Sequence, residues 1–267
     1  MSYALVAASL SLFVAVSLGQ PAQQRGASTP EPGSTVDLRL LNKPSTPPTT
    51  STASTASGST VSLSQYTIPA KARSLFEKAV HLKDHDKPDE ALKKVNAALD
   101  ICPKFAEALT LRGILQQNAG NPTGAAADFQ QAIQVDPNYP FAYIAMAALL
   151  NSSKRFDEAL PVLAEAERLA PDAWQVYFEL SRANVEKRDF TSALHNLNRA
   201  SELQGGPNKE APETHLVRGY ALIGLGDVPT AVHELETFLA LQPNGTPADH
   251  ARHVLDVLRS STVTADR

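Results

Sequence analysis

The sequence predicts an all-α solenoid built from about five helix pairs. An alanine recurs every 34 residues at four positions and then once more after 38 residues, at Ala91, Ala125, Ala159, Ala193 and Ala231. A second alanine series and a proline series run in phase with it, at Ala98, Ala132, Ala166 and Ala200 and at Pro103, Pro137 and Pro171. A fixed period of this length is typical of a solenoid, because each repeat buries its apolar face only by stacking on its neighbours.

The first element, residues 1–19, is predicted to be a signal peptide or an anchor. Tyr3–Leu18 carries no charge and consists largely of Ala, Leu and Val. This run is shorter than the roughly 20 residues that a membrane span needs, but it suits the apolar region of an export signal. Ser17 and Gly19 are small residues at the -3 and -1 positions of a predicted cleavage site before Gln20. No Lys or Arg precedes the run, so an uncleaved segment that tethers the protein to a membrane remains an alternative. We expect an exported protein, periplasmic or secreted.

Residues 20–66 are predicted to form a disordered linker. The stretch Pro44–Thr60 contains only Ser, Thr, Pro, Ala and Gly. Such a composition cannot bury enough apolar surface to offset the entropy lost on ordering. An apolar island at Val36–Leu41 could pair as a strand with a partner, or it could be a chance cluster.

From Ile68 onward the sequence predicts helix after helix, in repeats at 72–105, 106–139, 140–173, 174–207 and 212–245. Turn residues divide each repeat, and a proline follows most second helices, where a helix must stop. Gly205–Pro207 and an insertion of four residues predict a longer loop after the fourth repeat. Thr246–Asp249 resembles a capping box with proline at the first helical position. Together with apolar residues at helical spacing, it predicts a capping helix at 247–259, followed by a disordered tail at 261–267.

Composition excludes several other classes of protein. The net charge of the 267 residues is -4, and Lys and Arg are scattered, so no nucleic-acid partner is expected, because phosphate binding needs a basic face. Aromatic residues make up 6% of the chain, too few for a row of base-stacking platforms. Cys102 is the only cysteine, which excludes an intramolecular disulfide and a cysteine-based zinc site.

The 34-residue unit resembles the tetratricopeptide repeat family over about residues 70–245. The small residue of repeat position 8 is Ala79, Gly113, Ala147, Ser181 and Gly219; position 20 is the first alanine series; position 24 is Val95, Phe129, Leu163, Leu197 and Leu235. Small side chains let two helices cross at the short end of the 8–10 Å range. The resemblance implies a right-handed superhelical α-solenoid with a C-terminal capping helix.

Some positions depart from the family pattern. Gln116 and Asn184 occupy position 11, which is often aromatic, and Lys78, Arg112 and Arg218 occupy position 7, which is often leucine. We therefore expect looser packing in the second and fourth repeats. Phe238 replaces an alanine in the last repeat, and we expect it to lie against the terminal helix.

The resemblance implies a non-catalytic scaffold that binds a partner peptide or helix, of unknown identity, in a concave groove lined by the first helices. Mapping groove positions gives the candidate partner-binding residues Phe76, Val80, Ile114, Asn118, Phe141, Ile144, Asn151, Phe178, Arg182, Leu216 and Tyr220. The same positions also carry Glu107, Gln175, Glu186 and Glu213. An alternative is that Phe141, Ile144 and Phe178 belong to the core between repeats. A membrane-tethered adaptor in envelope assembly or biogenesis, and self-association through a repeat face, are alternative roles.

No catalytic, cofactor or metal site is expected. The sequence contains no glycine-rich phosphate loop and no nucleophile-elbow pentapeptide. His81 and His85, and likewise His250 and His253, are spaced to give two metal ligands. Neither pair has a third ligand in an established motif, so we interpret them as solvated surface histidines. Phe76 and Val80 stand where the family's chaperone-tail binders carry Lys and Asn, so an acidic chaperone tail is not an expected ligand.

Overall fold

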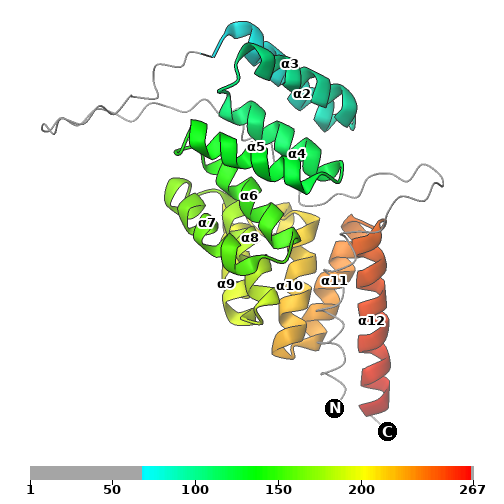
Figure 1. Cartoon of the computed structure of the whole chain (residues 1–267). Helices are drawn as coiled ribbons and strands as arrows, with labels where there is room; N and C mark the ends of the chain where they lie inside the picture. Colours follow the sequence, from blue (N-terminus) through cyan, green and yellow to red (C-terminus); the bar gives the residue numbers. More distant parts are fainter. Residues whose placement is uncertain (1–67, 266–267) are drawn as a thin grey trace, which may run out of the picture. The chain divides into compact units, whose positions relative to one another are not determined.

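The computed structural model describes residues 68–265, and all its regular structure is helical (Figure 1). Eleven α-helices and one short 3₁₀ helix follow one another, and no strand occurs among these residues. The all-α prediction is confirmed. The predicted signal or anchor at 1–19 and the linker at 20–66 lie outside the described residues. Two compact units divide the described chain, 68–142 and 143–265, which we call the N-terminal unit and the C-terminal unit.

The N-terminal unit contains two helix hairpins. Their helices are α2 (Ala70–Asp84), α3 (Pro88–Ile101), α4 (Ala106–Asn118) and α5 (Pro122–Val135). Helix α2 packs on α3 and α4 packs on α5, and α3 also packs on α4, which joins the two hairpins. The alanines of both series in this unit are fully buried. The 34-residue registers therefore mark the core, as predicted.

The C-terminal unit continues the alternation and ends with the capping helix. Its helices are α6 (Pro140–Ser152, which begins in the N-terminal unit), α7 (Phe156–Leu169), α8 (Trp174–Glu186), α9 (Phe190–Gln204), α10 (Pro212–Leu225), α11 (Val228–Leu241) and α12 (Thr246–Ala265). Helix α8 packs on α7, α9 and α10, and α10 packs on α9 and α11.

Close helix crossings explain the small residues at position 8. A methyl group added to Gly113 would overlap the ring of Phe129, and one added to Gly219 would lie 2.8 Å from Leu235 Cδ2. Both partners occupy position 24 of the same repeat. Because real methyl groups do not approach other atoms this closely, these two hairpins need glycine where their helices cross, and the other three carry the small residues Ala79, Ala147 and Ser181 at the same position.

The turn inside each hairpin has one residue in the left-handed conformation, always at position 15 of the repeat. Two repeats use glycine there, Gly120 and Gly226, whereas the other three use Asp86, Lys154 and Arg188 with φ of 55°, 59° and 63°. A side chain in this conformation is strained, because its Cβ crowds the following carbonyl oxygen. The turn geometry is therefore common to all repeats, although only two carry the residue that adopts it freely.

The insertion after α9 is an ordered loop. Gly205 and Gly206 both have positive φ, and a 3₁₀ helix, η3 (Pro207–Lys209), follows them. Glu210 then accepts two hydrogen bonds of 2.7 Å from the Arg218 guanidinium on α10. The longer loop that the sequence predicts is present, and an ion pair fixes its end to the next hairpin.

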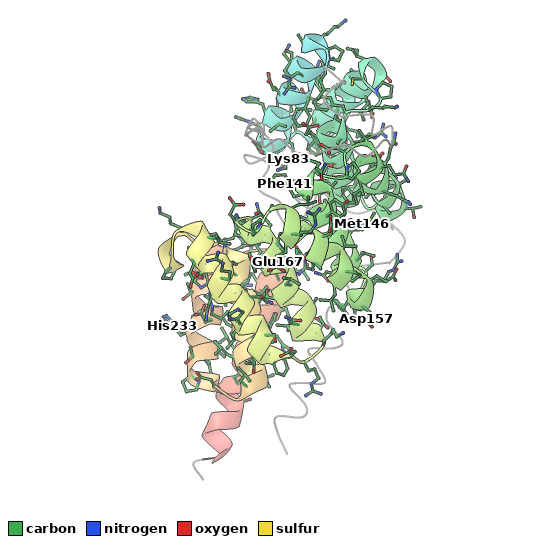
Figure 2. The ribbon with its side chains drawn as sticks, turned by 90° about the vertical axis from the view of Figure 1, so that its left-hand side faces the viewer. Lys83, Phe141, Met146, Asp157, Glu167 and His233 are labelled. Atoms are coloured by element: carbon green, nitrogen blue, oxygen red, sulfur yellow. The ribbon has the colours of Figure 1, made fainter. Side chains whose placement is uncertain are left out.

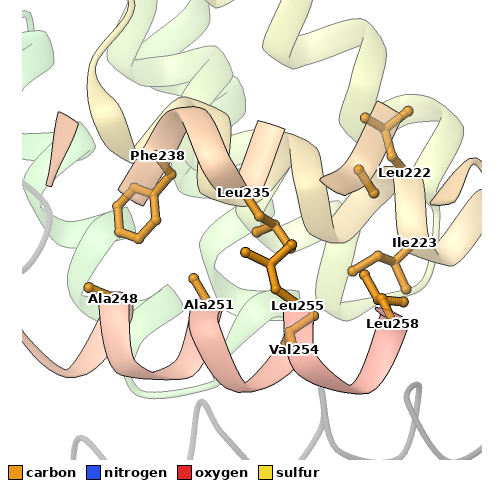
Figure 3. Packing of buried hydrophobic residues seen from close by; sticks show 10 residues of the cluster. Leu222, Ile223, Leu235, Phe238, Ala248, Ala251, Val254, Leu255 and Leu258 are labelled. Atoms are coloured by element: carbon orange, nitrogen blue, oxygen red, sulfur yellow. The ribbon is translucent and has the colours of Figure 1, made fainter. Parts of the chain in front are cut away.

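Helix α12 covers the last hairpin with a continuous apolar stripe (Figure 3). The stripe consists of Ala248, Ala251, Val254, Leu255 and Leu258. It packs on residues of α10 and α11 that include the fully buried Phe238, so the prediction that Phe238 lies against the terminal helix is confirmed.

The end of α12 corrects the predicted boundary. The helix runs to Ala265, six residues beyond the predicted end at Arg259, so most of the expected disordered tail at 261–267 is helical. The serines and threonines of this stretch have lower helix propensity than alanine, but neither glycine nor proline interrupts it.

Polar residues at positions 7 and 11 of the second repeat are paired with a buried carboxylate. Asp128 on α5 accepts hydrogen bonds of 2.8 and 2.6 Å from Arg112 and one of 2.9 Å from Gln116. The hydrogen bond to Asp128 is the main reason why the pKa of Arg112 is raised. We expected looser packing here. Instead, Arg112 and Gln116 both donate hydrogen bonds to one acid, Asp128 at position 23. Arg218 in the last repeat likewise lies 3.6 Å from Glu234, also at position 23.

Candidate binding faces on the first helices

The predicted partner-binding residues all lie on the first helices of the hairpins, and we call this side of each unit its first-helix face. In the N-terminal unit, Val80 and Phe141 are half-buried and Asn118 is exposed. Phe141, near the start of α6, is labelled in Figure 2. Phe76 and Ile114 are buried. The prediction that these last two residues are accessible to a partner is wrong.

Aromatic packing explains the burial of Phe76. Its ring centroid lies 5.1 Å from that of Phe105, which ends the loop before α4 and is itself fully buried. Tilted aromatic pairs at this separation are favourable. The phenylalanine at position 5 of the first repeat therefore belongs to the core of its unit.

Two ionisable groups of the N-terminal unit interact with each other, the half-buried carboxylate of Glu107 and the hydroxyl of Tyr139. Burial raises the pKa of Glu107, against the opposing effects of its backbone hydrogen bond and the charge of Arg73. The hydroxyl of Tyr139 is buried without a hydrogen-bond partner among the described residues. Burial, with the nearby charges of Glu107 and Asp136, raises the pKa of this hydroxyl.

In the C-terminal unit, the candidates divide in the same way. Arg182, Leu216 and Tyr220 are half-buried. Ile144 and Asn151 are 0% and 1% exposed, and Phe178 is also buried. These three residues cannot form an accessible surface, which corrects the predicted site. The alternative of a core role is thus right for Ile144 and Phe178, because position 5 packs inward.

A buried polar network connects α6 to α8 in the C-terminal unit. Asn151 Nδ2 donates hydrogen bonds of 2.9 Å to the backbone oxygen and to the carboxylate of Glu179. Arg182 Nη1 donates to both oxygens of the same carboxylate, at 3.1 and 2.9 Å. Glu179 is 2% exposed. Its buried charge is therefore compensated by one guanidinium and one amide.

An unpartnered amide lies on the same face of α8. Gln175 is 3% exposed, and neither its side-chain oxygen nor its nitrogen has a hydrogen-bond partner in the described part of the chain. Gln175, Glu179, Arg182 and Glu186 follow one another at spacings of three or four residues, so they share one side of the helix. A buried polar group without a partner destabilises a protein by about 1–3 kcal/mol, which makes this amide unusual.

Two carboxylates, Glu186 on α8 and Glu213 on the neighbouring α10, have no ion pair within residues 68–265. Burial raises the pKa of Glu213, and its own backbone hydrogen bond and the charge of Arg182 oppose this shift only in part. Burial also raises the pKa of Glu186, against the charges of Lys154 and Arg182. The ion pair of Arg182 is with Glu179, so its guanidinium is already hydrogen-bonded.

Comparison with known proteins identifies the repeat. Two family models described as tetratricopeptide repeat match residues 76–143 and 116–183. The repeats of residues 76–183 therefore belong to the tetratricopeptide repeat family. The N-alpha-acetyltransferase 16, NatA auxiliary subunit, of Mus musculus is 26% identical over 178 residues, which are 66% of this chain and 20% of that protein. The chain spans a fifth or less of the length of the curated relatives that it matches.

Solved structures show the same tetratricopeptide fold. A chain of the APC/C hetero-tetramer Cut9–Hcn1 gives a TM-score of 0.66 at 16% identity, covering 72% of this chain and 37% of that chain. A thermophilic tetratricopeptide protein of Thermus thermophilus gives a TM-score of 0.58 at 19% identity, covering 69% of this chain and 98% of that chain. At this level of identity, the likeness is one of fold.

The tetratricopeptide pattern gave no indication that two residues, Glu179 and His250, connect helices of the C-terminal unit through hydrogen bonds. Glu179 falls outside the groove positions, although its spacing of three residues before Arg182 was a visible pairing signal. His250, which we interpreted as a solvated surface residue, is buried. It shares a hydrogen bond of 2.7 Å with the Tyr220 hydroxyl, which connects α10 to α12.

The histidine pair on α2 has a different environment. His81 and His85 are exposed, and their rings stack with centroids 4.0 Å apart. The described residues contain no group of three or more His, Cys, Asp or Glu side chains placed to hold a metal ion. Among the same residues, no helix is both long and apolar enough to cross a bilayer.

Proposed function

We propose that the protein is a non-catalytic interaction scaffold that binds a partner peptide or helix along the first-helix faces of its tetratricopeptide repeats. Partner binding by such repeats is the general property of the family, and it supports a scaffold here. The observation that carries the proposal is a difference between the two helices of a hairpin. Apolar residues at positions 20 and 24 of the second helices are fully buried, whereas Val80, Phe141 and Leu216 on the first helices keep accessible surface.

This difference favours binding over a purely structural role. Partly exposed apolar side chains on rigid helices gain free energy when a partner covers them, at roughly 25 cal/mol per Å² of apolar surface. They are also held in place before binding, which limits the entropy lost on association.

Affinity capture followed by mass spectrometry, with the full chain as bait, tests the proposal. Phe141→Ala combined with Leu216→Ala should weaken capture of a specific partner about tenfold or more, with unchanged far-UV helicity. Leu241→Ala is the matched control, because Leu241 is an exposed apolar residue on a second helix, α11. Capture that survives the double substitution, or that the control abolishes, would show that the partner binds elsewhere.

We further propose that the scaffold acts outside the cytoplasm, on the basis of the uncharged apolar run within residues 1–19. The second candidate is a membrane-tethered adaptor in envelope assembly or biogenesis, which the absence of a basic residue before that run favours. N-terminal sequencing of the mature protein separates the two. A chain that starts at Gln20 supports release, and an intact Met1 supports the tether.

A further inference from the structure

One part of the C-terminal unit combines unpaired acid with an unpartnered amide. We call it the α8–α10 face. Its half-buried residues are Arg182 and Glu186 on α8 and Glu213 and Leu216 on α10, and the buried Gln175 lies on the same side of α8. The two helices pack on each other. Gln175 and Glu213 both lie in the first turn of their helices, and Leu216 follows one turn after Glu213.

The charges of this face favour a cation. Its half-buried carboxylates are Glu186 and Glu213, and its only arginine, Arg182, is bonded to the buried Glu179. Lys154 lies near Glu186 and opposes the effect of burial on that residue. The ionised form of Glu213 is stabilised by a hydrogen bond from its own backbone N–H and, to a smaller extent, by the charge of Arg182. A cation brought beside this half-buried carboxylate would interact with it more strongly than in bulk water, because the local dielectric constant is lower.

The unpartnered amide indicates a second polar group in the ligand. Gln175 has one donor and one acceptor group without a partner, and Asn151 Oδ1 on α6 is a further buried acceptor without one. A peptide main chain offers a donor and an acceptor in every residue, so an extended segment can satisfy such an amide. The two amide atoms of Gln175 are buried in the free protein, so this bonding requires the side chain to turn outward when the segment binds. The apolar surface of Leu216 lies on the same face and suits the aliphatic stem of a long basic side chain.

We propose that the α8–α10 face recognises a lysine or arginine of an extended partner segment, whose charge is received by Glu213 and whose main chain bonds to Gln175. This inference rests on the proposed scaffold function and specifies the chemistry of its partner. The partner is a basic peptide segment rather than an acidic one. The bound cation favours the ionised form of Glu213, and the ionised carboxylate in turn binds the cation more strongly.

Fluorescence anisotropy with three labelled peptides tests the proposal on the full-length protein. The probes are Gly-Ser-Leu-Ala-Xaa-Ala-Leu-Ser-Gly, in which Xaa is Lys, Gln or Glu. The Lys peptide should bind about tenfold more tightly than the Glu peptide at low salt, with the Gln peptide between them. The preference should shrink as sodium chloride is raised from about 50 to about 500 mM, because salt screens the charge interaction.

Two substitutions separate the roles of the two residues. Glu213→Gln should bring the Lys and Gln peptides to within about twofold of each other, with the affinity of the Gln peptide unchanged. Gln175→Leu, which keeps side-chain volume, should weaken all three peptides by a similar factor of about five, because it removes bonds to the main chain. Glu202→Gln is the matched control, since Glu202 is an exposed acid at the end of α9 that is paired with Arg199. Far-UV circular dichroism establishes that each variant is folded.

The possible outcomes discriminate between the inference and the function on which it rests. Equal binding of the three peptides to the wild-type protein overturns the basic-segment inference. The scaffold proposal still stands in that case if the Phe141→Ala and Leu216→Ala pair weakens partner capture. Failure of all three peptides to bind also overturns the inference, as does self-association that Glu213→Gln abolishes in light scattering, because a second copy then covers the face.

Discussion

The first-helix faces of the two units differ in chemistry although they arise from the same repeat. In the N-terminal unit, position 5 of the first repeat is Phe76, which packs on Phe105 in the core. In the C-terminal unit, α8 places Glu179 and Arg182 in a buried network with Asn151 from α6. The 34-residue pattern determines how helices cross, and it leaves the first-helix positions free to vary. Position 9, for example, is apolar on α2 and α4, as Val80 and Ile114, and charged on α8, as Arg182, in hairpins of the same kind.

The largest expected effect tests whether the two units share the same kind of core. Phe129 and Leu235 occupy position 24, each fully buried against the glycine where the helices of its hairpin cross. Phe129→Ala should lower the free energy of unfolding by about 3–5 kcal/mol and Leu235→Ala by about 2–5 kcal/mol, through lost burial and the cavity that is left. Urea denaturation followed by circular dichroism measures both. A loss below about 1 kcal/mol in one unit alone would show that its core is organised differently.

The second prediction concerns buried ion pairs, which replace an apolar contact in some repeats and are absent from others. Arg112→Leu removes the guanidinium that neutralises Asp128 and should lower the free energy of unfolding by about 3 kcal/mol. The double variant with Asp128→Leu should recover most of this loss, because no unpaired buried charge is left. Lys78→Leu, at the same position of the first repeat, is the control, since Lys78 is exposed and should contribute within about 0.5 kcal/mol. Equal losses in the single and double variants would contradict the ion-pair explanation.

The third prediction is that the C-terminal unit loses stability in acid through His250. Burial, with the nearby His253, lowers the pKa of His250 to about 4, below its ordinary value of 6.5. Because the unfolded chain binds this proton first, stability is complete above about pH 6.5 and falls by about 1–3 kcal/mol as the pH decreases to about 4. His250→Gln removes the titration, so its unfolding free energy should change less over this range. His195→Gln is the control, because the ring of His195 on α9 lies outside the buried cluster beneath α12. An unaltered pH profile in His250→Gln would assign the acid sensitivity to other groups.

These contrasts show why part of the molecule could be predicted from sequence. A close helix crossing requires a small residue at one position, and a helix end tolerates proline at one position, so the alanine and proline registers indicated the hairpins directly. The Arg112–Asp128 pair joins residues 16 apart on different helices, and its partner could not be identified from periodicity alone. The burial of Ile144 and Asn151 depends on what neighbouring helices place over them, which a groove-position rule does not contain. The second and last repeats each carry arginine at position 7 and an acid at position 23. This recurrence was the sequence pattern that indicated the ion pair.

The smallest expected effect concerns the turn that all repeats share. Position 15 has positive φ in every hairpin, but Asp86 in the N-terminal unit and Lys154 and Arg188 in the C-terminal unit carry side chains there. Lys154→Gly should raise the free energy of unfolding by about 0.5–1 kcal/mol, because relief of the strained conformation outweighs the greater entropy of glycine in the unfolded chain. Gly226→Ala should change it in the opposite direction by a similar amount, because alanine would have to adopt a φ of 84°. Thermal unfolding of the two variants beside the wild type measures both effects. If Lys154→Gly destabilises the protein, contacts of the lysine side chain outweigh the backbone strain, and the five turns are alike in geometry but not in energy.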